Sequence, residues 1–64
     1  MKFHKWQSRP TNIVFAKMIE EVGEVGAELA EGYVHPERIV EELDHVIGIA
    51  TILRGRFAEL DKSN

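Results

Sequence analysis

A break of five residues divides this chain into two stretches that have the periodicity of an α-helix. The break reads GYVHP at residues 32–36, and it holds a glycine and a proline, which commonly end and start helices. Apolar residues recur at a period near 3.6 from Val14 to Leu29 before the break, and again from Ile39 to Phe57 after it. The sequence therefore predicts an all-α fold, an antiparallel helical hairpin.

The first helix is predicted over residues 12–31. Thr11 or Asn12 is expected to cap its start, because both side chains accept hydrogen bonds from the unpaired N–H groups of a first turn. Gly32 is the expected stop, since glycine adopts the left-handed conformation that commonly follows a helix.

The second helix is predicted over residues 36–60. Pro36 suits its first turn, where a helix leaves the backbone N–H unused. Residues 1–10 form a basic arm that contains two aromatic side chains, Phe3 and Trp6. We find no internal repeat or domain boundary, so residues 1–64 are expected to form a single domain.

The chain has only 64 residues with which to build a core, and none of them is cysteine. A chain of this length buries only about 60% of the surface that its unfolded form exposes, which leaves a marginal core. Disulfides are excluded, and no paired His/Cys spacing suggests a structural zinc. We therefore expect a homodimer or homotetramer in which hairpins pack into a four-helix bundle.

Charge is distributed unevenly along the chain. Residues 20–44 hold nine acids and one base, and the remainder holds seven bases and two acids. Because an acidic middle repels a polyanion, we expect no nucleic-acid partner. No apolar run approaches the roughly 18 residues of a membrane span, and the start MKFHKWQSRP is too polar for a signal peptide. A cytoplasmic protein without a membrane partner is expected.

Three glutamates follow one flank of the first apolar stripe. Glu21 and Glu24 are three residues apart and Glu28 follows four later, so they stand one above another, whereas Glu20 points outward. Acids at these spacings repel one another, and a stack of them at the edge of a core favours a bound cation. Oxygen ligands suit Mg²⁺, with Mn²⁺ as the alternative.

The second helix offers two further pairs of candidate ligands. Glu41 and Asp44 are three residues apart, and so are Glu42 and His45. Facing acidic edges of two antiparallel helices are how helical bundles assemble carboxylate metal sites. Both pairs are open candidates.

The two acidic motifs together resemble a known family. EEVGE at residues 20–24 and EELD at residues 41–44 look like the EExxE and ExxD signature of MazG-like, all-alpha nucleoside triphosphate pyrophosphohydrolases. The stretch WQSRPTNIVFAKMIEEVGEVGAELAEG is similar to the first part of the dCTP pyrophosphatase branch, and the resemblance covers residues 6–53. It implies Mg²⁺-dependent hydrolysis of a nucleotide between the α and β phosphates, which gives a monophosphate and pyrophosphate.

The resemblance also implies roles for individual residues. It assigns the metal to Glu21 and Glu24 on the first helix, and to Glu41 and Asp44 on the second. One further carboxylate, Glu20 or Glu24, would orient or deprotonate the attacking water.

A second register on the second helix is also open. Family members usually read EELxDV, and this alignment places His45 at the metal-binding aspartate, with Glu42 as its partner. Helical geometry favours it, because Glu42 lies about 70° from the apolar stripe whereas Glu41 points away from it. A neutral imidazole offers less charge to Mg²⁺ than a carboxylate does, which implies weaker activity or a changed metal preference.

Three residues outside the acidic motifs are candidates for binding the substrate. Trp6 can stack on a nucleobase and Asn12 can hydrogen-bond to its edge, although Trp6 can equally anchor the arm. Lys17 can contact a phosphate, or it can pair with Glu21 four residues later.

The predicted function is a metal-dependent nucleotide pyrophosphohydrolase that acts on a (deoxy)nucleoside triphosphate. One alternative is a MazG-like helical binding or assembly module with weak or no catalysis, and another is an unrelated helical dimerisation domain. The sequence has no glycine-rich phosphate loop and no Ser/His/Asp set. Arg54 and Arg56 are expected to be solvated surface residues.

Overall fold

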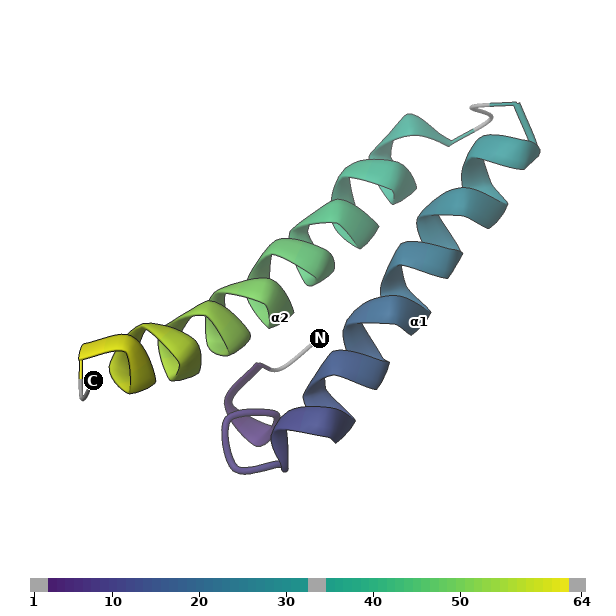
Figure 1. Cartoon of the computed structure of the whole chain (residues 1–64). Helices are drawn as coiled ribbons and strands as arrows, with labels where there is room; N and C mark the ends of the chain where they lie inside the picture. Colours follow the sequence, from purple (N-terminus) through teal and green to yellow (C-terminus); the bar gives the residue numbers. More distant parts are fainter. Residues whose placement is uncertain (1–2, 33–34, 63–64) are drawn as a thin grey trace.

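Two long helices make up most of the structure, a computed structural model that describes residues 3–32 and 35–62 (Figure 1). A short 3-10 turn, η1 (Phe3–Lys5), precedes α1 (Thr11–Ala30) and α2 (Pro36–Lys62). The two helices pack against each other as an antiparallel hairpin, which confirms the predicted fold class. Within the described residues, no helix is both long and apolar enough to cross a membrane. Residues 1–2 of the predicted arm, residues 33–34 of the break between the helices, and residues 63–64 lie outside the described residues.

The start of α1 differs from the prediction. Pro10 occupies the N-cap with φ −57° and ψ 149°, and no side chain caps the helix. The carbonyl oxygen of Pro10 accepts hydrogen bonds from the backbone N–H groups three and four residues later, both at 3.0 Å. The predicted cap at Thr11 or Asn12 is wrong, because the Thr11 hydroxyl accepts a hydrogen bond from Arg56 at 3.0 Å instead.

The end of α1 lies where the sequence placed its stop. Gly32 has a φ of 90°, in the left-handed region where a Cβ is strained. Its backbone N–H donates to the carbonyl oxygen of Leu29 at 3.1 Å, which satisfies one of the last carbonyls of the helix. The chain can therefore leave α1 abruptly and turn back.

α2 begins at Pro36, whose missing N–H falls where a helix has no use for one. The carbonyl oxygen of His35 accepts hydrogen bonds from the backbone N–H groups of Arg38 at 3.0 Å and Ile39 at 3.4 Å. The helix continues to Lys62, two residues beyond the predicted end.

The core between the two helices is small. Val14 and Ile49 are fully buried, and Leu53 is 9% exposed. Three partly buried side chains pack against this cluster: Trp6, Met18 and Ile52. Ten further large hydrophobic side chains of the described chain are between 41% and 61% exposed. One hairpin by itself therefore leaves much of its apolar surface in water.

The hairpin presents two unlike faces. At about 100° per residue, most of the exposed hydrophobic residues and most of the carboxylates fall on opposite sides of the line where α1 meets α2, whereas Ile13 lies on the side of the carboxylates. The side that we call the apolar face carries Phe15, Ile19, Val22, Leu29, Leu43 and Phe57. The opposite side, the acidic face, carries Lys17, Glu20, Glu21, Glu24, Glu28, Arg38, Glu42 and His45.

Residues 3–10 of the N-terminal arm fold back against α2 near the open end of the hairpin (Figure 1). Arg56 holds them there, because one guanidinium nitrogen donates to the carbonyl oxygens of Trp6 at 3.3 Å and Gln7 at 2.9 Å. The expectation that Arg56 is a solvated surface residue is wrong, since its guanidinium also binds the Thr11 hydroxyl. The arm is therefore part of the folded structure.

We predict that Gly32→Ala lowers the free energy of unfolding by about 1 kcal/mol, because a Cβ is strained in the left-handed region. Urea unfolding followed by far-UV circular dichroism measures the change. Gly23→Ala is the matched control, because Gly23 lies within α1 and a Cβ there meets no atom within 4 Å. Alanine favours a helix over glycine by up to about 1 kcal/mol, so this control should gain stability. A gain for both variants would contradict the assigned role of Gly32.

Candidate functional site

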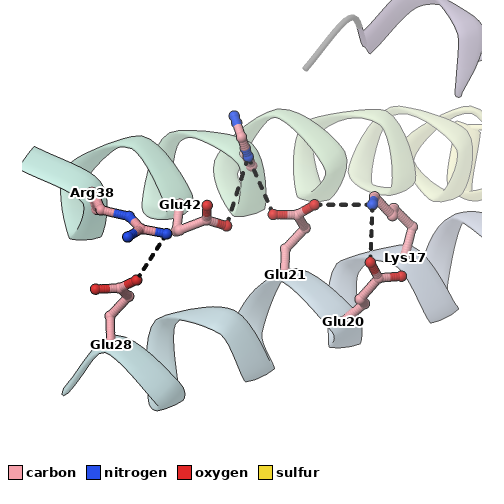
Figure 2. Close-up of polar contacts among 7 residues, drawn as sticks. Lys17, Glu20, Glu21, Glu28, Arg38 and Glu42 are labelled. Carbon is pink, nitrogen blue, oxygen red and sulfur yellow. Dashed lines mark hydrogen bonds and ion pairs between the residues drawn. The ribbon is translucent and has the colours of Figure 1, made fainter. Parts of the chain in front are cut away.

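Glu21 is the one charged side chain among the described residues that is buried, with 3% of its surface exposed. α1 aims it at α2, and each carboxylate oxygen meets a basic group (Figure 2). Lys17 Nζ lies 3.1 Å from Oε1, and His45 Nδ1 lies 3.2 Å from Oε2. These partners compensate a buried charge that would otherwise be costly.

The surroundings of Glu21 keep it ionised. Burial acts to raise the pKa of Glu21, but hydrogen bonds with Glu42, Lys17 and His45 outweigh burial, so that its pKa lies below the ordinary value. Burial acts to lower the pKa of Lys17, and its hydrogen bonds to Glu21 and Glu20 outweigh that effect and raise it. The Lys17 and Glu21 pair is therefore charged on both sides at neutral pH.

Glu42 approaches Glu21 from α2 and behaves in the opposite way. A hydrogen bond with Glu24, burial, and a hydrogen bond with Glu21 raise the pKa of Glu42 to about 7. Near neutral pH, Glu42 therefore holds a proton more readily than an ordinary glutamate does. Its Oε2 atom is buried without a hydrogen-bond partner, and the His45 Nδ1 atom lies 3.8 Å away. This oxygen is the unsatisfied acceptor of the acidic face.

Two groups of three side chains are placed to share one cation, and Glu21 belongs to both. The ligand atoms of each group lie within 4.8 Å of one another. The two groups are Glu21, Glu42 and His45, and Glu20, Glu21 and Glu24. The orphaned oxygen of Glu42 and the carboxylate donors fit a divalent ion, and the imidazole of His45 favours Mn²⁺ over Mg²⁺.

The structure distinguishes the two registers on α2. It brings Glu42 and His45 to Glu21, whereas Glu41 and Asp44 are exposed and belong to neither group found among the described residues. Each of these two acids lies about 100° further around α2 than the neighbouring residue that faces α1. Helical phase thus keeps the first-named pair, Glu41 and Asp44, out of the site.

The two carboxylates assigned to the attacking water lie on the open side of the acidic face. Glu20 has a side chain that is 60% exposed, and its Oε1 atom lies 3.3 Å from Lys17 Nζ. Glu24 is exposed as well, and its carboxylate is the largest cause of the raised pKa of Glu42. Glu24 is therefore the acid in closer contact with the α2 side of the site.

The three candidate substrate residues have different surroundings. Lys17 pairs with Glu21, which is the alternative to a phosphate contact. Trp6 packs against the core, and its ring centroid lies 5.6 Å from Lys5 Nζ and 5.5 Å from Lys17 Nζ. Its indole N–H is buried without a hydrogen-bond partner. Asn12 is exposed in the first turn of α1.

One basic residue of the acidic face had no predicted role. Arg38 Nη2 lies 3.4 Å from Glu28 Oε1, and it spans the two helices near the loop end (Figure 2). The sequence marked Arg38 as the one base of residues 20–44, but no spacing along the chain indicated Glu28 as its partner.

A separate, shallow and open pocket of about 400 Å³ lies on α2 beside Gln7 of the arm. Its lining residues are Gln7, Thr51, Ile52, Gly55, Arg56 and Glu59. Two of its polar side chains already form hydrogen bonds within the protein. Arg56 donates to the arm, and the Thr51 hydroxyl donates to a carbonyl oxygen of its own helix at 2.7 Å. The chemistry of the acidic face is therefore the stronger guide to function.

No protein-family model, curated protein or solved structure matches this chain. The two acidic motifs and the geometry around Glu21 are the observations from which a function can be proposed.

We predict that the stability of the metal-free protein falls as the pH rises from about 5 to about 8. The pKa of Glu42 is about 7 in the folded chain and 4.5 in the reference state, so only the folded chain holds this proton between those values. The contribution is complete below pH 4.5 and is lost as the pH rises through 7. Its full size is up to about 3 kcal/mol. The lowered pKa of Glu21 acts at lower pH, where protonation of its carboxylate costs stability.

Urea unfolding across this pH range tests the prediction in three proteins. Glu42→Gln should remove the slope that Glu42 contributes, whereas Glu41→Gln, an exposed neighbour, should retain it. Identical profiles for the original chain and Glu42→Gln would refute the assignment.

Proposed function

We propose that this chain is a metal-dependent pyrophosphohydrolase that cleaves a (deoxy)nucleoside triphosphate to a monophosphate and pyrophosphate. The supporting observation is that Glu21, Glu42 and His45 converge from two helices, with ligand atoms within 4.8 Å of one another. Glu20 and Glu24 add further carboxylates on the open side. Such a set attracts the divalent ions that a triphosphate requires. The resemblance of the EEVGE and EELD motifs supports the same activity.

In the proposed reaction, one set of residues binds the metal and another accepts a proton. Glu21, Glu42 and His45 would hold Mg²⁺ or Mn²⁺, which when bound screens the phosphate charge and lowers the pKa of water. Glu24 accepts the proton of the attacking water, and it is better placed than Glu20, whose carboxylate binds Lys17. The water oxygen bonds to the α-phosphorus, the bond to the oxygen that bridges the α and β phosphates breaks, and pyrophosphate leaves with that oxygen.

We predict that the purified protein releases pyrophosphate from at least one nucleoside triphosphate, and more rapidly with Mn²⁺ than with Mg²⁺ because His45 is a nitrogen donor. A panel of ribo- and deoxynucleotides with a coupled pyrophosphate assay measures this. Glu21→Gln should lower kcat by about 100-fold or more, since second-sphere changes around metals already cost 10–100-fold. Asp44→Asn is the matched control and should leave kcat unchanged, because Asp44 lies outside the site.

Circular dichroism of every variant separates lost chemistry from lost structure. If a folded sample released no pyrophosphate from any nucleotide of the panel, the enzymatic proposal would be refuted. The same chain would then be a MazG-like binding or assembly module without catalysis. The activity would operate in the cytoplasm, where nucleoside triphosphates are made.

The apolar face supports a homodimer. Among the residues that the structure describes, a single chain buries only three hydrophobic side chains, and the large hydrophobic residues of the apolar face are about half exposed. A stable dimer buries about 1,200 Å² or more in total, or about 600 Å² from each copy. That is roughly an eighth of the 4725 Å² surface of one chain. Pairing of two such faces completes a four-helix bundle and leaves both acidic faces outward.

We predict that light scattering after size exclusion gives the mass of two chains, and that the melting temperature rises with protein concentration. Leu43→Lys places a charge on the apolar face and should shift the equilibrium to monomer. Glu41→Lys is the control, since residue 41 lies about 160° away around α2. A monomeric original chain at high concentration would exclude the dimer, and a mass of four chains would show a tetramer in its place.

A further inference from the structure

Arg56 makes the longest-range polar contacts of the described chain. Its guanidinium donates to the Thr11 hydroxyl at 3.0 Å and to the carbonyl oxygens of Trp6 and Gln7 at 3.3 Å and 2.9 Å. These partners lie 45 to 50 residues away along the sequence. A charged donor with three acceptors forms strong hydrogen bonds, so Arg56 fixes the arm to both helices.

The fixed arm brings Trp6 to the acidic face. The Trp6 ring packs against the core cluster, and Lys17 Nζ lies 5.5 Å from its centroid, within the range of a cation–π contact. The indole therefore forms a wall beside the Lys17 side chain, which is only 20% exposed. The wall restricts the directions in which the ammonium can leave.

The Lys17 ammonium occupies the carboxylates that both candidate cation groups need. It lies 3.1 Å from Glu21 Oε1 and 3.3 Å from Glu20 Oε1. Glu21 belongs to both groups, and Glu20 belongs to one of them. A divalent ion on these oxygens would be repelled by the ammonium at close range, so the two cations compete.

We propose that Arg56 is a positioning residue that latches the N-terminal arm and, through Trp6, holds Lys17 on Glu21 as a resident counter-cation that a divalent ion displaces. The contacts from Arg56 to Trp6, from Trp6 to Lys17 and from Lys17 to Glu21 form one continuous chain. The displacement of Lys17 by a divalent ion rests on the cation site of the proposed function. The attachment of the arm by Arg56, which we call the latch, does not depend on that site.

The latch is tested without metal, because Trp6 is the single tryptophan of the chain and reports on its own surroundings. Arg56→Gln should raise the acrylamide quenching constant of Trp6 by about twofold and shift its emission to the red, since three charged hydrogen bonds are lost. Arg54→Gln is the matched control: Arg54 is exposed and lies about 160° around α2 from Arg56.

Trp6 protection that is equal in Arg56→Gln and the original chain would overturn the latch. Circular dichroism first confirms that the helices remain. If Arg56→Gln unfolds, Thr11→Val removes one acceptor of the guanidinium at little cost in shape, and it should loosen Trp6 to a smaller degree. Unchanged quenching in Thr11→Val would then count against the proposal.

Displacement is tested by Mn²⁺ binding, with the free ion followed by electron paramagnetic resonance. Lys17→Gln should bind Mn²⁺ about tenfold more tightly, because a competing positive charge is removed. Arg56→Gln should gain affinity in the same direction by a smaller factor. Lys5→Gln is the control, since Lys5 lies 5.6 Å from the same ring but outside the acidic face.

The outcomes distinguish this inference from the proposed function. If no variant binds Mn²⁺, the cation site and displacement fail together, while the Trp6 quenching still decides on the latch. If Mn²⁺ binds equally to the original chain and to Lys17→Gln, displacement is refuted and the cation site stands. In the original chain, saturating Mg²⁺ should also change the Trp6 emission beyond an ionic-strength control, since the ammonium leaves the ring.

Discussion

A buried carboxylate compensated by two basic groups is the interaction on which the rest of the structure depends. Glu21 lies between α1 and α2 at a place where water cannot screen it, and Lys17 and His45 each bind one of its oxygens. Removing one partner of such an arrangement leaves an uncompensated buried charge, which is far more costly than losing an exposed ion pair. The register of the two helices is therefore fixed by polar contacts on one side, while a core of three hydrophobic side chains supplies the contact between them.

The separation of apolar and acidic side chains onto opposite faces links stability to function. Carboxylates gathered on one face repel one another, and the raised pKa of Glu42 reflects the free energy stored in that crowding. Exposed hydrophobic residues on the other face leave a single hairpin short of burial. Association through the apolar face would supply the missing burial, and a cation on the acidic face would relieve the repulsion. The exposed apolar face would thus be covered by a second chain, and the repulsion on the acidic face would be relieved by a cation.

Local signals predicted the fold, and distant contacts account for what the sequence left open. The period of the apolar residues, Gly32 and Pro36 are read within a few residues, and they placed both helices and the turn. Helical phase pointed to Glu42 and His45, although the linear ExxD motif named a different pair. The cap at Thr11 was mistaken because the partner of its hydroxyl, Arg56, lies 45 residues away. Neither the helical period of the apolar residues nor a short sequence spacing can predict a hydrogen bond between residues so far apart in the chain.

The chemistry of the Arg56 contacts sets what the arm can tolerate. Two of its three acceptors are main-chain carbonyl oxygens, which every amino acid provides. The side chain at Gln7 is therefore not required for these bonds, whereas the guanidinium of Arg56 is. The same position suits a fluorophore or an affinity label, which would report on the arm without cutting its attachment to α2.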